Sequence, residues 1–194
     1  MTDSEIRQRI TLKKEKGRKN YSFVPEGEKI VCRAPVKTTE EDLLRLIGAH
    51  RRALTNLIKR SDALNEAAKA EPPLSESELN CLYAEAQKVI PPIVRHYAGI
   101  MGVLFGRITI RCQKTRWGSC SSKNNLNFNC LLMLMTPYEI EYVVVHELAH
   151  LKELNHSPAF WAEVERVLPD YAERRRSLKE KGEQIMLRNH RQKP

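Results

Sequence analysis

Long apolar runs are missing from this 194-residue sequence, although hydrophobic residues make up 41% of it. Runs such as Cys130 to Met135 and Tyr142 to Val145 fall far short of the roughly 20 residues that a membrane span needs. The first 19 residues are strongly polar and hold no continuous apolar stretch of the kind that a secretory leader requires. We therefore expect a soluble, cytoplasmic protein without a membrane partner.

Cysteine pairs of the C-x-x-C type are also missing. The five cysteines are odd in number and widely spaced: Cys32, Cys81, Cys112, Cys120 and Cys130. This usage fits a reducing compartment better than a disulfide framework. It also disfavours a structural zinc site made of thiolates.

Acidic residues are fewer than basic ones, 24 against 33, so the formal net charge is +9 and the isoelectric point is near 9.4. Much of the basic charge lies in two clusters, Lys13 to Lys19 and Arg174 to Lys181. A solvated surface is the favoured interpretation of such clusters, and they support nucleic acid as a partner only weakly.

The first third of the sequence predicts strands followed by a helix. Residues 20–24 and 29–33 indicate two short strands across a turn at Pro25 to Glu28, and residues 6–12 alternate loosely. A capping box at Thr38 to Glu41 then opens a helix with an apolar stripe that runs to Ile58. From Ser61 the stripe fades and the stretch ends in Pro72-Pro73, which favours a linker there.

The middle of the sequence predicts a helix and a small sheet. A capping box at Ser75 to Glu78 opens the helix, which Pro91-Pro92 should kink or interrupt. Residues 107–111 alternate like a half-buried strand. Residues 115–120 and 126–130 look like two more strands, joined as a hairpin by a polar turn, so we expect an antiparallel sheet.

A helix with the sequence pattern H-E-x-x-H follows. Thr136, Pro137 and Glu139 form its start signal. His146 and His150 are four residues apart, so both imidazoles lie on one helical face and can reach a single cation. Glu147 lies about 100° round the helix, where its carboxylate can hold a water molecule beside the metal instead of binding the metal itself.

A catalytic zinc ion usually takes three protein ligands, so a third must be found. His156 could serve if the helix ends first, with Asn155 in a left-handed cap and Ser157-Pro158 opening a new helix. Glu163 or Glu165 is the alternative third ligand. Three imidazoles favour one zinc ion per chain, although another divalent metal can fill such a site.

Several short motifs together resemble the YgjP-like family of zincin-type metal-dependent hydrolases and, more distantly, the SprT-like metalloproteases, which act on DNA-bound proteins. They are Arg116 to Cys120, Asn127 to Asn129, His146 to His150, Asn155 to Pro158 and Phe160-Trp161. The resemblance implies an α+β, zincin-like fold, zinc at the three histidines, and a hydrolase or peptidase activity. We therefore predict a β-rich segment with a helix over residues 1–72, packed on a metallohydrolase core over residues 73–188, and a basic tail over residues 189–194.

The predicted chemistry is hydrolysis of an amide bond in a peptide or protein, with Glu147 as general base and then general acid. Candidates for steadying the oxyanion are Tyr142, Tyr171 and Arg116. Trp117, Gly118, Ser119 and Cys120 form either a substrate-binding edge or ordinary core packing.

Three alternatives stay open. The metal could be structural in a nucleic-acid-associated protein, or it could pin two helices in a scaffold. Cys120 as a nucleophile is disfavoured, because no separate histidine partner is suggested near it.

Overall fold

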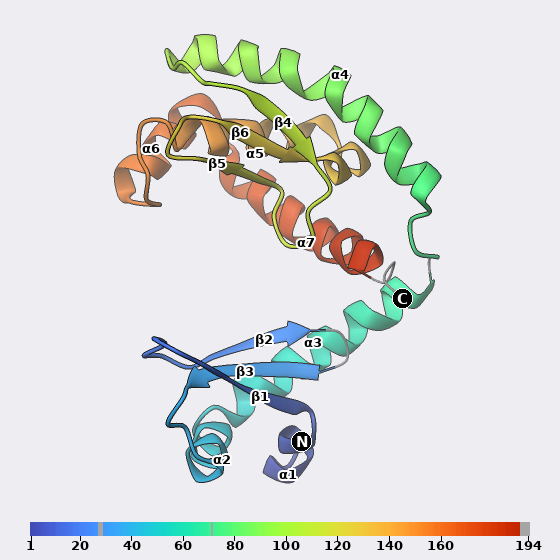
Figure 1. Ribbon diagram of the computed structural model, residues 1–194, viewed down its shortest axis with the longest axis vertical. Helices are drawn as coiled ribbons and strands as arrows, with labels where there is room; N and C mark the ends of the chain where they lie inside the picture. Colours follow the sequence, from blue (N-terminus) through green and yellow to red (C-terminus); the bar gives the residue numbers. More distant parts are fainter. Residues whose placement is uncertain (27–28, 71, 191–194) are drawn as a thin grey trace. The chain divides into compact units, whose positions relative to one another are not determined.

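The computed structural model describes residues 1–26, 29–70 and 72–190 (Figure 1). The chain divides into two compact units, which we call unit 1 (residues 1–71) and unit 2 (residues 72–194). The boundary predicted from Pro72-Pro73 lies one residue further along. Whether residues 1–72 pack on the core stays a prediction.

Unit 1 contains three helices and three strands, in the chain order α1 (Asp3–Gln8), β1 (Ile10–Glu15), β2 (Ser22–Glu26), β3 (Lys29–Pro35), α2 (Glu40–Ala49) and α3 (Arg51–Ala70). The predicted hairpin is confirmed, because β2 pairs antiparallel with β3, although its turn at residues 27–28 lies outside the described residues. β1 adds on the other side of β3 in parallel, giving the strand order β1-β3-β2.

The core of unit 1 lies between this sheet and its helices. Leu43 and Ile47 of α2 are fully buried, and Leu54 and Ile58 of α3 are nearly so. The prediction of one helix along this stripe is wrong, because α2 ends at Ala49 and α3 begins at Arg51. The capping box lies one residue later than predicted, between Thr39 and Asp42. The predicted linker beginning at Ser61 is wrong, since α3 continues to Ala70. The apolar stripe fades because the sequence from Ser61 onward is rich in alanine and polar residues, which favour a helix without forming an apolar face.

Unit 2 contains four α-helices, three strands and one 3₁₀ helix. In chain order these are α4 (Glu76–Met101), β4 (Ile108–Arg111), β5 (Gly118–Cys120), β6 (Leu126–Asn129), η1 (Cys130–Leu134), α5 (Pro137–Ala149), α6 (Pro158–Val167) and α7 (Tyr171–His190). None of the described helices has both the length and the apolar character of a membrane span.

The sheet of unit 2 is mixed, so the prediction of a purely antiparallel sheet is wrong. The hairpin of β5 and β6 is antiparallel as expected, and Asn124 in its turn adopts a left-handed conformation with φ 58°. β4, however, pairs parallel to β6, which makes β6 the central strand. The segment between β4 and β5 carries the chain across the sheet, and alternation along a strand contains no information about its partner's direction.

α4 passes through Pro91 and Pro92 without ending, so the predicted interruption does not occur. Its buried face includes Ile90 and Val94 on either side of the two prolines. Burial of this face stabilises the helix enough to offset the roughly 3 kcal/mol that an interior proline costs. Figure 1 shows α4 as a long arc beside the sheet, and its contacts are with β4, η1 and α5.

α5 is the buried helix of unit 2. Nine of its residues are buried, and it contacts β5, α4, α6 and α7. The apolar spacing of its sequence predicts a core stripe of Ile140, Val144, Leu148 and Leu151; the first three are buried and Leu151 is half-buried. Because α5 is enclosed by so many elements, its side chains can be held in fixed positions.

Candidate metal centre

The N-terminus of α5 is anchored by Glu139. The side chain of this residue is fully buried, and its carboxylate accepts hydrogen bonds from the backbone N–H and the hydroxyl of Thr136. Ser177 and Lys181 of α7 donate to its other oxygen, both over 2.6 Å. Burial alone would raise the pKa of Glu139, but these hydrogen bonds outweigh it and lower the pKa to about 2. The start signal read from the sequence therefore also joins α5 to α7.

The structure brings His146, His150 and His156 together. One ring nitrogen from each lies within 4.8 Å of the other two, and Nε2 of His146 is 3.0 Å from Nε2 of His156. Two nitrogens on a tetrahedral zinc ion lie roughly 3.3 Å apart, given Zn–N distances of about 2.0–2.1 Å. The separation of His146 and His156 fits a single ion, and the longer separations in the cluster, up to 4.8 Å, would have to shorten when all three nitrogens bind it.

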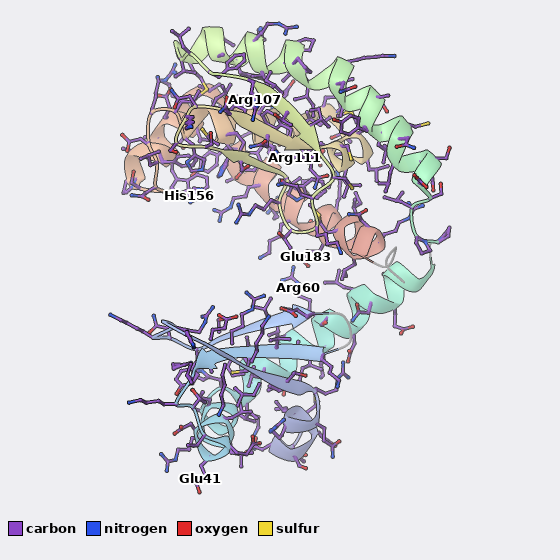
Figure 2. All side chains as sticks on the ribbon, in the orientation of Figure 1. Glu41, Arg60, Arg107, Arg111, His156 and Glu183 are labelled. Carbon is purple, nitrogen blue, oxygen red and sulfur yellow. The ribbon has the colours of Figure 1, made fainter. Side chains whose placement is uncertain are left out.

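His156 reaches the cluster because α5 ends at Ala149 and the chain then turns (Figure 2). The predicted left-handed Asn155 is wrong, since Asn124 is the only non-glycine residue with positive φ in the described part of the chain. The turn is made instead by backbone hydrogen bonds that tighten the helix end, from Leu151, Lys152 and Glu153 back to Leu148 and Ala149. Ser157 then caps α6 by accepting from the N–H of Phe160.

His150 has a defined tautomer. Its Nδ1 lies 3.1 Å from the carbonyl oxygen of Glu153, and a carbonyl can only accept a hydrogen bond. Nδ1 therefore carries the hydrogen, and Nε2 keeps a free lone pair. Such a contact on the second nitrogen is typical of metal-binding histidines.

His146 is positioned by packing. Its Nδ1 is buried and has no hydrogen-bond partner among the described residues. Phe160 stands edge-on to its ring at 4.9 Å between centroids, and Tyr142 lies at 5.9 Å. Burial, with the neighbouring histidines and Arg175, lowers the pKa of His146 to about 3, and burial also lowers the pKa of His150. Both imidazoles are thus neutral at pH 7, the form that binds a metal.

Glu147 occupies the same pocket without belonging to the histidine cluster. The pocket holds about 290 Å³ and is lined by Arg116, Gly118, Ser119, Cys120, His146, Glu147, His150, Leu154 and His156. Burial raises the pKa of Glu147 to about 8, although a hydrogen bond from the Cys120 backbone and the charge of Arg116 act against it. A carboxylate with a raised pKa beside a metal cluster is suited to taking up a proton.

The position of the Glu147 side chain requires a glycine at position 118. A Cβ atom on Gly118 would lie 2.7 Å from both Cγ and Oε1 of Glu147. The glycine in the Trp117 to Cys120 run thus marks a close approach of strand β5 to the helix, one of the two readings that a strand glycine allows. Trp117 itself packs on the core, against Gly182 of α7. Gly118 to Cys120 thus form part of the pocket wall and Trp117 packs on the core, while binding of a substrate along this run stays a prediction.

The alternative ligands lie apart from the cluster. Glu163 binds Lys152 at 2.7 Å and Arg166 at 2.8 Å, and neither it nor Glu165 belongs to the cluster found among the described residues. Cys120 lines the pocket, but its thiol donates to the Ser121 carbonyl and burial raises its pKa. A thiol with a raised pKa is a poor nucleophile.

Two residues of the site were missed from the sequence. Leu154 is 78% exposed and lines the pocket, and Arg175 lies over the ring of Trp161. Trp161 in turn stacks on His156, with 5.7 Å between ring centroids and an angle of 23°. For Leu154, the sequence offers only an apolar residue within a polar turn as a sign of a role in the site. The position of Arg175 depends on how α7 packs, which the sequence does not reveal.

The α+β core and its histidine cluster define a metal-dependent peptidase. The family model for the YgjP-like metallopeptidase domain matches residues 67–181, more than half of the chain, so the chain belongs to the YgjP-like family. The resemblance seen in the sequence motifs is confirmed.

Two crystal structures of metallopeptidase zymogens are similar over part of the chain. Abylysin of Pyrococcus abyssi is 27% identical, with a TM-score of 0.43, and the match covers 47% of this chain and 94% of abylysin. Jannalysin of Methanocaldococcus jannaschii is 22% identical with the same TM-score, and the match covers 47% of this chain and 95% of jannalysin. No curated protein matches the chain.

Proposed function

We propose that this protein is a zinc-dependent peptidase in which His146, His150 and His156 hold the metal and Glu147 moves the proton. One observation carries the proposal: a buried carboxylate and three metal-binding nitrogens face the same pocket. Three imidazoles leave one position of a tetrahedral zinc ion open, as catalytic sites require. A closed structural site would need a fourth protein ligand, and the cluster found in the described part of the chain contains three residues.

Zinc, when bound, would polarise the scissile carbonyl and lower the pKa of water at its open position to about 7. Glu147 takes the proton from the attacking water in its ionised form, which a cation held by the three histidines would favour against the effect of burial. It then delivers that proton to the leaving amine. Gly118 keeps the carboxylate in place, since its missing side chain leaves the space that Glu147 fills.

The substrate would lie along β5. This strand is at the edge of its sheet, and its residues Gly118, Ser119 and Cys120 line the pocket. An extended peptide can pair with such an edge through backbone hydrogen bonds, which gives affinity without demanding a particular sequence. Of the three candidates for steadying the oxyanion, Arg116 lines the pocket, whereas Tyr142 is 5% exposed and does not.

The test is digestion of a peptide library by zinc-loaded protein, with cleavage sites read by mass spectrometry. We expect Glu147→Gln to cut at least about 10³-fold more slowly while keeping its metal, because it loses the base but no ligand. Glu165→Gln is the matched control, since Glu165 is exposed and lies outside the pocket. Equal cleavage by Glu147→Gln would refute the proposed mechanism.

The structural-metal alternatives predict different results. A scaffold would carry stoichiometric metal, unfold when the metal is removed, and cut no peptide. A nucleic-acid-associated protein would bind oligonucleotides in a salt-sensitive way, and Glu147→Gln would leave that binding unchanged. We also place the protein in the cytoplasm, which is supported by its five free cysteines.

A further inference from the structure

We propose that Arg116 and Arg175 make the site selective for peptides that carry a carboxylate next to the scissile bond. The proposal rests on the peptidase function above and goes beyond it by naming the substrate's charge. The carboxylate can come from an acidic side chain or from the peptide's own C-terminus.

Arg116 gives the pocket its cationic side. It is exposed, and among the described residues that line the pocket it is the one lysine or arginine. Glu147 is the only acidic residue on the same wall, and its role is to exchange protons. Arg116 has no carboxylate within ion-pair distance in the part of the chain that the structure describes. Its guanidinium is thus available to a ligand.

Arg175 gives the outer border of the site a second positive charge. Its guanidinium carbon lies 4.8 Å from the centroid of the Trp161 ring, a cation–π contact. Trp161 stacks on the ligand His156, so Arg175 is one ring removed from the metal cluster. Like Arg116 it is exposed and has no ion-pair partner among the residues described.

Other arginines of unit 2 are used differently. Arg166 binds Glu163, and Arg174, which precedes Arg175, binds both Asp170 and Glu141. The charge of Arg174 is therefore neutralised by two carboxylates of the protein. The neighbouring Arg175 has, among the described residues, a recorded contact with the aromatic face of Trp161 and no ion pair. A guanidinium held over a ring still has its N–H groups free, and these match the two oxygens of a carboxylate. Arg116 in the pocket and Arg175 beside it are therefore two arginines that form no ion pair among the described residues and can bind the carboxylate of an incoming peptide.

The experiment uses one library peptide that the zinc-loaded protein cuts, made in four forms. A residue beside the cut is glutamate or glutamine, and the C-terminus is free or amidated, so the two sources of the carboxylate are separated. The proteins are the wild type, Arg116→Gln and Arg175→Gln. Arg107→Gln and Arg176→Gln are the controls, since both arginines are exposed and neither lines the pocket nor is recorded over the Trp161 ring. Figure 2 labels Arg107 just before β4.

We expect wild type to favour an acidic form over the fully neutral one by about tenfold in kcat/KM, mostly through KM, and each site variant to reduce that ratio to about threefold or less. The controls should keep the wild-type ratio. A wild-type ratio near one would overturn the proposal. So would an Arg116→Gln variant that lowers kcat equally for acidic and neutral forms, because that result would place Arg116 at the reacting carbonyl.

Binding keeps the two proposals separate. If the zinc-loaded protein cuts no peptide, the peptidase function fails, but calorimetric titration with any one library peptide made in the same four forms still measures selectivity. We then expect the acidic forms to bind about tenfold more tightly, and the preference to weaken at high salt. Equal affinities for all four forms would refute the role of the two arginines.

Discussion

Unit 1 and unit 2 contain sheets of the same topology, but only one of them supports the histidine cluster. In each sheet the last strand is central, pairing parallel with the first and antiparallel with the second. In each unit a helix that begins with a threonine capping box then follows, at Thr39 for α2 and at Thr136 for α5. The sheet and the cap are therefore not sufficient to make the site.

The difference lies in the length and burial of the two helices. α2 ends at Ala49, ten residues after its cap, and α5 has the first histidine of the cluster, His146, ten residues after its own cap. α2 buries two residues on one face, whereas α5 buries nine and is enclosed by other helices. A site of this kind needs a helix long enough to reach the pocket and packed closely enough to hold a charged group out of water.

The largest effect should come from removing a ligand. We expect the zinc-loaded wild type to keep about one ion per chain after dialysis, and His150→Ala to keep a small fraction of that, because a two-ligand site binds far more weakly. His50→Ala, at the end of α2, should keep the full amount. Metal analysis by mass spectrometry measures all three, and equal metal in His150→Ala would rule out the cluster as the site.

Replacing a glycine by alanine should impair activity in unit 2 but increase stability in unit 1. Gly118→Ala would place its Cβ 2.7 Å from Glu147, so we expect kcat to fall about 10²-fold with the metal retained. Gly48→Ala in α2 meets only Asp3, at 3.8 Å, and should stabilise the helix by roughly 0.5–1 kcal/mol. Kinetics with a library peptide and thermal melting check the pair. Unchanged kcat in Gly118→Ala would refute the close contact.

The contributions of the two capping boxes to the free energy of unfolding should depend differently on pH. The pKa of Glu139 is lowered to about 2 in the folded state, so its stabilisation is full above about pH 4.5 and is lost as the pH falls toward 2. We expect Glu139→Gln to cost about 2 kcal/mol at pH 7 and to flatten this acid limb. Asp42→Asn in the exposed box of α2 should cost less. Urea unfolding from pH 7 to pH 2 provides the measurement, and equal losses for both variants would contradict it.

The metal cluster could be predicted from the sequence because its information is local. The spacing of His146 and His150 fixes a shared helical face, and Ser157-Pro158 marks the start of a helix that leaves room for a turn before it. The identity of His156 as the third member follows from that turn. Its placement next to His146 agrees with the prediction, even though the turn uses different backbone geometry.

Features that depend on distant contacts could not be predicted. The parallel pairing of β4 with β6 is decided by how the chain crosses the sheet, and alternation of residue type is the same in either direction. The length of α3 was missed because its exposed end lacks an apolar stripe. Arg175 was missed because its place over Trp161 depends on the packing of α7, which no spacing in the sequence reveals.

The hydrogen bond from Nδ1 of His150 to the carbonyl of Glu153 ties one member of the histidine cluster to the chain that follows α5. It fixes the orientation of the ring and keeps the hydrogen on Nδ1, so the lone pair of Nε2 stays available to a metal. Because the acceptor is a backbone carbonyl, this orientation does not depend on the identity of the side chain at position 153.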